Sequence, residues 1–362
     1  MKTNLLNFVV IIFLLSCKNN QNNYACTPCD LSCDTLSFSK PGTCPKCSMP
    51  LILKKDLEKQ NEQVVNEINI HEGSGTFMIE GGKNKTDKPI KVYYHKPRNF
   101  NANSKILMVI PGAGRNGDSY RDAWVEESEK YNVLILSPMY AEENYPFEDY
   151  HLCGVMANLN LRNSITYIKN TNKVKLEEDK FEFTINTNKN AWIFNDFDRI
   201  FDFAVKTLHS NQTQYDAFGH SAGGQILHRL AILASASKVD RILASNSGFY
   251  TLPDFDKALP FGLKDTPIDK KDLRQSFKRK LVLFTGELDN ENETGGTLLR
   301  SNSADLQGLH RLERAEYFYK TSKAIAEELQ YDFNWKLKII PNVGHNHRKM
   351  GDAAAIYLYE KK

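Results

Sequence analysis

The chain has 362 residues, of which 41% are hydrophobic, and its 47 Lys and Arg against 44 Asp and Glu give a formal net charge of +3. Positive and negative charges are mixed along the chain without a basic stripe, so nothing supports nucleic-acid binding. No G-x-G-x-x-G or phosphate loop stands in the right context for a nucleotide site. About 290 residues after the first 70 suit one α/β domain rather than two.

The first 16 residues have the pattern of a secretory signal. Lys2 is a short basic region, and residues 5–15 are apolar except for one asparagine, too short to span a bilayer as a helix. The segment ends at Ser16-Cys17, which resembles a bacterial lipobox. We expect cleavage before Cys17, lipidation of its sulfur, and attachment to a membrane surface outside the cytoplasm. Residues 17–23 then form the lipidated cysteine and a polar tether. The alternative is an ordinary cleaved signal with a coincidental cysteine.

Residues 24–53 form a cysteine-rich unit. Cys26 and Cys29 make one C-x-x-C pair, Cys44 and Cys47 make another, and Cys33 lies between them. Two such pairs can together bind one tetrahedral metal, zinc or another soft ion. The segment resembles the small heavy-metal-binding modules of metal-efflux proteins, in which the residue matching Cys29 is usually histidine. Disulfides are the alternative, because an oxidising compartment permits them.

Residues 54–69 are charged and polar and are predicted as a linker, and the remaining residues, 70–362, as the main domain. Within that domain, residues 75–79 and 90–95 alternate like a first strand pair. Residues 105–110 and 133–138 are continuous apolar runs typical of buried strands. Repeated apolar strands and amphipathic helices predict an α/β fold with a mostly parallel sheet covered by helices on both faces.

Residues 142–190 interrupt this strand–helix rhythm. Two short segments within them, 172–176 and 181–185, have strand character. We expect them to form a hairpin over the active site.

A G-x-S-x-G pentapeptide, Gly219 to Gly223, is the most informative motif of the chain. It follows a short apolar strand at 215–218 and precedes a helix at 225–233. A sharp strand–turn–helix is the context that exposes a serine hydroxyl at the top of a sheet, and the flanking glycines leave room for the tight turn. Ser221 is therefore the predicted nucleophile, and His220 beside it is interpreted as a packing residue.

An acid and a base follow in the order that an α/β-hydrolase requires. Asp289 comes just after the apolar strand 280–285, and His345 follows the strand 337–341. Because serine is a poor nucleophile at its free pKa, an imidazole must take its proton, and a carboxylate must orient that imidazole. The order Ser221, Asp289, His345 is typical of this fold. Alternatives are Asp254 and Asp256 for the acid and His347 for the base.

An oxyanion hole is expected where the strand 105–110 runs into the loop 111–117. One donor is the backbone N–H of the residue after the nucleophile, Ala222. The loop supplies the other from Ala113, Gly114 or Arg115, and we favour Gly114 and Arg115.

These motifs carry a family resemblance. The stretches 110–122, 219–224 and 343–346 look like bacterial α/β-hydrolases related to polyhydroxybutyrate depolymerases and feruloyl esterases. The resemblance covers residues 70–362 and implies an α/β-hydrolase fold and ester hydrolysis without a cofactor. This chain departs from the family's pattern at Pro111, where many relatives carry a histidine that supports the oxyanion loop, so the resemblance does not extend to the geometry of this loop.

Two classes of function follow from the sequence. The first is a membrane-anchored serine hydrolase acting on a carboxylic ester, with a serine peptidase of the same fold as its alternative. The second is a metal-binding lipoprotein whose hydrolase domain is inactive, because the fold alone does not decide function. Four aromatic residues have two interpretations, as the lining of a substrate pocket or as ordinary core: Tyr140, Trp192, Phe249 and Tyr250.

Overall fold

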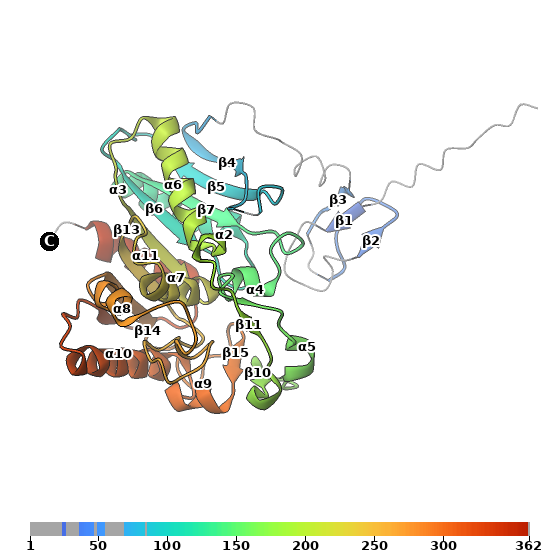
Figure 1. Cartoon of the computed structure of the whole chain (residues 1–362). Coiled ribbons are helices and arrows are strands. Elements are labelled where there is room, and N and C mark those ends of the chain that lie inside the picture. The colour runs from blue at the N-terminus through green and yellow to red at the C-terminus, as the bar shows by residue number, and fades with distance from the viewer. Residues whose placement is uncertain (1–23, 27–35, 47–48, 55–68, 84, 361–362) are drawn as a thin grey trace, which may run out of the picture. The chain divides into compact units, whose positions relative to one another are not determined.

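The structure is a computed structural model that describes residues 24–26, 36–46, 49–54, 69–83 and 85–360. The chain divides into two compact units, residues 1–63 and 64–362. Figure 1 shows their elements in chain order. Among the described residues, no helix has both the length and the apolar character needed to cross a bilayer.

The N-terminal unit contains a small antiparallel sheet with strand order β2-β1-β3. Its strands are β1 (Tyr24–Cys26), β2 (Ser37–Phe38) and β3 (Leu51–Leu53). The Cys44 amide donates to the Met49 carbonyl at 2.8 Å. Cys44 is a free, buried thiol packed against Phe38 and Leu51.

The second unit is built on an eight-stranded sheet with the order β16-β14-β13-β12-β6-β7-β5-β4. Strands β4 and β5 run antiparallel to their neighbours, and the other pairs are parallel. The strands are β4 (Gly73–Ile79), β5 (Ile90–Lys96), β6 (Lys105–Ile110), β7 (Val133–Met139), β12 (Tyr215–His220), β13 (Val239–Ser245), β14 (Lys280–Gly286) and β16 (Lys336–Ile340).

The central strands are apolar on both faces, which is why both faces must be covered. Ile242 and Leu243 are neighbours in β13 and both fully buried, yet they belong to two separate core clusters, one on each side of the sheet. The expected mostly parallel sheet and its first strand pair are confirmed, the pair being the antiparallel β4 and β5, and this is the α/β-hydrolase arrangement.

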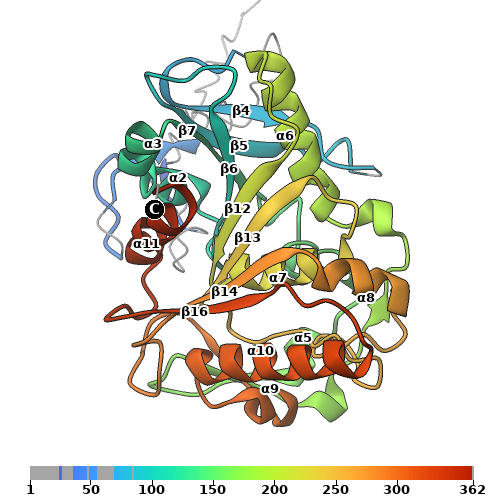
Figure 2. The ribbon, with the colours of Figure 1, turned by 90° about the vertical axis from the view of Figure 1, so that its left-hand side faces the viewer.

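Helices form a layer on each face of the sheet, as Figure 2 shows. One layer has α2 (Gly117–Asp122), α3 (Val125–Tyr131) and α11 (His347–Tyr359). The other has α6 (Phe194–Leu208), α7 (Ala222–Leu233), α8 (Lys270–Phe277) and α10 (Arg311–Glu328). Side chains cap three of these helices: Asn346 at α11, Asp269 at α8 and His310 at α10.

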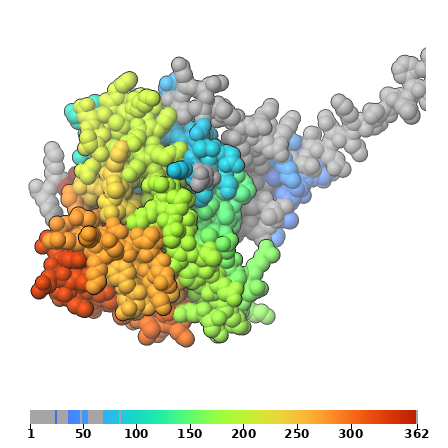
Figure 3. All heavy atoms as spheres, viewed as in Figure 1, coloured from blue at the N-terminus to red at the C-terminus, as the bar shows by residue number. Residues whose placement is uncertain are grey.

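Residues between β7 and α6 form short elements outside the main sheet. They are α4 (Phe147–Tyr150), β8 (Met156–Ala157), α5 (Leu161–Ser164), β9 (Ile165–Tyr167), β10 (Lys173–Leu176), η1 (Glu178–Lys180), β11 (Thr184–Ile185) and η2 (Lys189–Ala191). Strand β10 pairs with β15 (Leu298–Arg300), and η1 is hydrogen-bonded to α9 (Asn302–Gln307). The two regions adjoin on the surface in Figure 3.

The expected hairpin of 172–176 with 181–185 is wrong. Strand β10 pairs with β9 and β15, while β11 pairs with β8. The physical reason is the turn η1 between them, where Glu178 accepts hydrogen bonds from the amide and hydroxyl of Ser303, both at 2.7 Å. This anchor directs the chain toward α9 rather than back along β10.

Candidate active site

Ser221 lies at the tight turn between β12 and α7. Its backbone has φ 58° and ψ −116°, a conformation that costs energy for any residue with a side chain. The Ser221 amide donates to the Ser245 carbonyl at 2.9 Å, and its own carbonyl accepts from Gln225. These bonds hold the strained serine at the carboxyl edge of the sheet, where it stays partly exposed.

The two glycines of the pentapeptide permit this turn through close backbone approach. A Cβ on Gly219 would lie 2.4 Å from the Gly223 carbonyl oxygen. A Cβ on Gly223 would lie 2.1 Å from the Ile110 oxygen at the end of β6. Larger residues would therefore push the serine away from the loop that follows β6.

His345 and Asp289 are hydrogen-bonded, with 2.8 Å between His345 Nδ1 and Asp289 Oδ2. Both side chains are buried, at 5% and 1% exposure. Gly286 allows the Asp289–His345 contact, because a Cβ at this position would lie 2.3 Å from the Val343 oxygen. The end of β14 and the segment before His345 can thus lie side by side.

The Asp289 carboxylate has two further donors that the sequence did not reveal. Asn246 donates to Oδ2 at 2.6 Å, and Arg311 donates to Oδ1 at 3.1 Å. Burial would raise the pKa of this carboxyl, but the hydrogen bond from His345, the charges of His345 and Arg311, and the Asn246 bond together lower it. Asp289 is therefore ionised at neutral pH.

The His345 imidazole is neutral at rest. Burial lowers its pKa, the Asp289 hydrogen bond and charge oppose that effect, and the charge of Arg311 adds to it, with a net lowering. A neutral imidazole whose Nδ1 bonds a carboxylate leaves Nε2 as the acceptor for a proton. This is the protonation state that a general base needs.

The alternative acid and base lie in other surroundings. Asp254 accepts from the Asp256 amide at 2.9 Å and lies 4.0 Å from Lys257 Nζ, so its carboxylate is engaged within its own loop. His347 stacks on Tyr120 with 4.5 Å between ring centroids.

His220 is a packing residue between the motif and the base. It is 3% exposed, its Nδ1 lies 3.3 Å from the Tyr120 hydroxyl, and its ring centroid lies 4.4 Å from that of His345. Burial and the neighbouring His345 and His347 hold its pKa well below the ordinary value. This contact places the residue before Ser221 directly against the His345 ring.

The loop after β6 gives Arg115 another role than the oxyanion donor that the sequence analysis favoured. The Arg115 amide donates to the Gly112 carbonyl at 3.1 Å and closes a turn, so this N–H is already engaged. Arg115 has φ 55°, and its buried guanidinium donates to the carbonyls of Tyr140 and Tyr145. Arg115 thus supports the loop, while Gly114 and Ala222 stay the predicted oxyanion donors.

Tyr150 and Arg115 support this loop, which has Pro111 where many relatives carry a histidine. The Tyr150 hydroxyl donates to the Pro111 carbonyl at 2.7 Å, and the Arg115 guanidinium lies 4.9 Å from the Tyr150 ring centroid. A Cβ on Gly112 would lie 2.7 Å from the Tyr120 hydroxyl and 3.5 Å from Ser221 Cβ. The loop is therefore fixed close to the serine.

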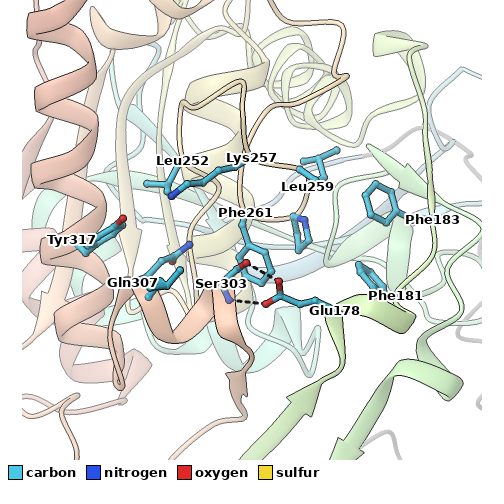
Figure 4. A pocket seen from close by; sticks show the side chains of 13 residues that line it. Glu178, Phe181, Phe183, Leu252, Lys257, Leu259, Phe261, Ser303, Gln307 and Tyr317 are labelled. Atoms are coloured by element: carbon cyan, nitrogen blue, oxygen red, sulfur yellow. Dashed lines mark hydrogen bonds between the residues drawn. The ribbon is translucent and has the colours of Figure 1, made fainter.

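A cavity of about 330 Å³ lies between the 142–190 segment, the loop after β13 and α9. Figure 4 shows Phe181, Phe183 and Phe261 around it, with the Glu178–Ser303 hydrogen bonds at its wall. Ser221, Asp289 and His345 are not among its lining residues. Tyr140, Trp192, Phe249 and Tyr250 do not line it either, and all four are buried, which fits their interpretation as core.

Within the described part of the chain, no group of three or more His, Cys, Asp or Glu side chains could hold a metal. The predicted ligand set cannot be judged from this, because Cys29, Cys47 and the side chain of Cys26 lie outside the described residues. The predicted lipidation site, Cys17, and Cys33 also lie outside them.

No family model and no curated protein sequence matches the chain. Among solved structures, poly(aspartic acid) hydrolase-1 from Sphingomonas sp. KT-1 is 30% identical with a TM-score of 0.67, over 81% of this chain and 100% of that one. The chain belongs to the α/β-hydrolase family of that enzyme. A poly(3-hydroxybutyrate) depolymerase from Bordetella parapertussis shares the fold at 23% identity and the same TM-score, over 80% of this chain and 92% of that one. The protein is therefore a serine hydrolase of this family.

Asp289 and one of its alternatives, Asp254, can be separated by matched substitutions. We expect Asp289→Asn to lower kcat by orders of magnitude, because the amide would favour the wrong His345 tautomer and orientation. Asp254→Asn should leave kcat near wild type, since its carboxylate serves its own loop. Steady-state kinetics on a chromogenic ester measure both. An inactive Asp254→Asn beside an active Asp289→Asn would show that the acid is misassigned.

Proposed function

We propose that this protein hydrolyses carboxylic esters through Ser221, His345 and Asp289. The observation that carries the proposal is the buried Asp289–His345 hydrogen bond of 2.8 Å, at the sheet edge where the strained Ser221 turn lies. Such an arrangement supplies a nucleophile, a base and an orienting carboxylate, and serine chemistry needs no cofactor.

The reaction follows from these positions. Ser221 Oγ attacks the ester carbonyl carbon while His345 Nε2 takes the hydroxyl proton, and Asp289 stabilises the imidazolium that forms. The oxyanion accepts hydrogen bonds from the amides of Ala222 and Gly114. The intermediate collapses, His345 returns the proton to the leaving alkoxide, and an acyl-enzyme remains. Water, deprotonated by His345, then attacks the acyl carbon. The bond between that carbon and Ser221 Oγ breaks, His345 returns the proton to Oγ, and the acid is released.

The nucleophile can be tested directly with a fluorophosphonate probe on the full chain. We expect covalent labelling of Ser221 and turnover of short-chain or feruloyl esters. Both should be lost in Ser221→Ala, because this substitution removes the nucleophilic hydroxyl and nothing else. Mass spectrometry locates the label, and Ser247→Ala, which removes a nearby buried hydroxyl, is the matched control. An unlabelled, folded wild type that hydrolyses none of the esters would favour the metal-binding lipoprotein with an inactive hydrolase domain.

A second candidate is amide hydrolysis in an acidic polymer. The full-length match at 30% identity is to an enzyme named for poly(aspartic acid), and the same triad serves peptidases. The substrate series therefore includes poly(aspartic acid) and poly(3-hydroxybutyrate) with short esters. Release of acidic fragments at a higher kcat/KM than that for the esters would favour the amide candidate.

We also propose a lipid anchor at Cys17 that holds the protein in the cell envelope, on the basis of the Ser16-Cys17 motif after the apolar segment. In the native host, Cys17→Ser should move the protein from the membrane to the soluble fraction, because serine cannot carry a thioether-linked lipid. Fractionation with immunoblotting measures this, and Cys153→Ser is the matched control, since Cys153 is buried in the hydrolase unit. A Cys17→Ser protein that stays in the membrane fraction would refute the anchor.

The cysteine-rich unit is proposed to bind one soft metal ion, such as zinc, through Cys26, Cys29, Cys44 and Cys47. With the reduced full-length protein, we expect about one zinc per chain, weaker binding at low pH because protons compete for the thiolates, and loss of binding in Cys44→Ser. Ester hydrolysis should survive chelation. Equilibrium dialysis with metal analysis gives the stoichiometry. Zinc-free reduced protein, or disulfides that persist in the native protein, would support the disulfide alternative.

A further inference from the structure

Arg311 is the first residue of α10, and it meets the acid inside the protein. Its side chain is 2% exposed, and its Nη1 donates to Asp289 Oδ1, the oxygen that His345 does not use. The next amide, that of Leu312, donates to the Asp289 backbone carbonyl at 3.1 Å. The first two residues of α10 therefore donate hydrogen bonds to the side chain and to the main chain of Asp289.

The same guanidinium holds a second segment. Arg311 Nη2 donates to the Thr297 carbonyl at 3.0 Å, at the end of the loop 290–297. A Cβ on Gly296, which has φ +62°, would lie 2.6 Å from His345 Nε2 and 3.1 Å from Arg311 Nη2. This loop thus passes directly beside the nitrogen that must take the serine proton.

Glu293, within the same loop, is hydrogen-bonded to the backbone of His345. Its carboxylate accepts the His345 backbone N–H at 2.6 Å and the Gly295 amide at 2.7 Å. The loop contacts His345 at the backbone through Glu293 and at the ring through Gly296. Arg311 links this loop to the acid.

We propose that Arg311 is a positioning residue for hydrolysis, with one guanidinium fixing both the Asp289 carboxylate behind His345 and the loop beside His345 Nε2. The proposal rests on the proposed triad. Planar geometry suits arginine to this task, because two nitrogens of one rigid fork reach two acceptors at once. Lysine has a single nitrogen and cannot reproduce both contacts in the same way.

The charge of Arg311 has a consequence for the pH dependence. Five groups face His345: Asp289, Arg311, Glu293, His220 and His347. The charges of the two carboxylates raise the pKa of His345, and Arg311 lowers it. Since His345 acts as a base only when neutral, removal of the Arg311 charge should move the acid limb of kcat/KM to higher pH.

The test compares Arg311→Gln and Arg311→Lys in the full chain. In Arg311→Gln we expect kcat to fall about 10- to 100-fold through misplacement of the acid and loop, with the acid limb shifted to higher pH. Arg311→Lys should keep the wild-type acid limb, because the charge remains, but recover only part of kcat. The pH profiles of kcat and kcat/KM separate the two effects.

Arg314→Gln is the matched control. Arg314 is a fully buried arginine of the same helix, but it bonds Gly248 and Gly308 carbonyls and Asp305 instead of the acid. Its loss should affect thermal stability without moving the acid limb. A shift in Arg314→Gln equal to that in Arg311→Gln would overturn the proposal, because the effect would then come from general disturbance.

Two other outcomes would also overturn it: a folded Arg311→Gln with wild-type kcat and acid limb, or an Arg311→Lys indistinguishable from wild type in both. Should Arg311→Gln not fold, the lysine variant alone decides through its kcat. Failure of the proposed triad is recognised separately, as wild-type ester hydrolysis by Ser221→Ala.

Discussion

A single buried carboxylate organises this active site. Asp289 receives hydrogen bonds from Asn246 after β13, from His345 after β16 and from Arg311 at the start of α10. A charge at 1% exposure is costly to desolvate unless such donors compensate it. Stabilising Asp289 in its ionised form thus requires three segments, distant in sequence, to meet at one edge of the sheet.

The serine side of the site depends on backbone contacts instead of charge. The strained Ser221 conformation is held because the residues around it approach β6 and β13 more closely than side chains would allow. Its energy cost is offset by the packing of two neighbouring strands and a buried helix. The strained serine turn and the ionised acid therefore arise from different physical causes, and His345, bonded to Asp289, packs against His220 beside the serine.

Much of this arrangement could be predicted from sequence because it depends on local patterns. The apolar runs of β6, β7, β12 and β14 predict buried strands, and the glycines beside Ser221 predict a sharp turn. Asn246 and Arg311 could not be found in this way, since each is an ordinary polar residue until the fold brings it to Asp289. The pairing of β10 was missed for the same reason, because its partner β15 lies more than 120 residues away.

The contacts of Tyr150 and Arg115 join the loop after β6 to the segment that follows β7. Tyr150 belongs to α4, at the start of the segment that leads to the aromatic cavity, and Arg115 reaches the carbonyls of Tyr140 and Tyr145 beside it. Exchange of this segment between homologues would carry the loop's support with it. A change in this segment that removed the Tyr150 hydroxyl or moved these two carbonyls would therefore also loosen the loop after β6.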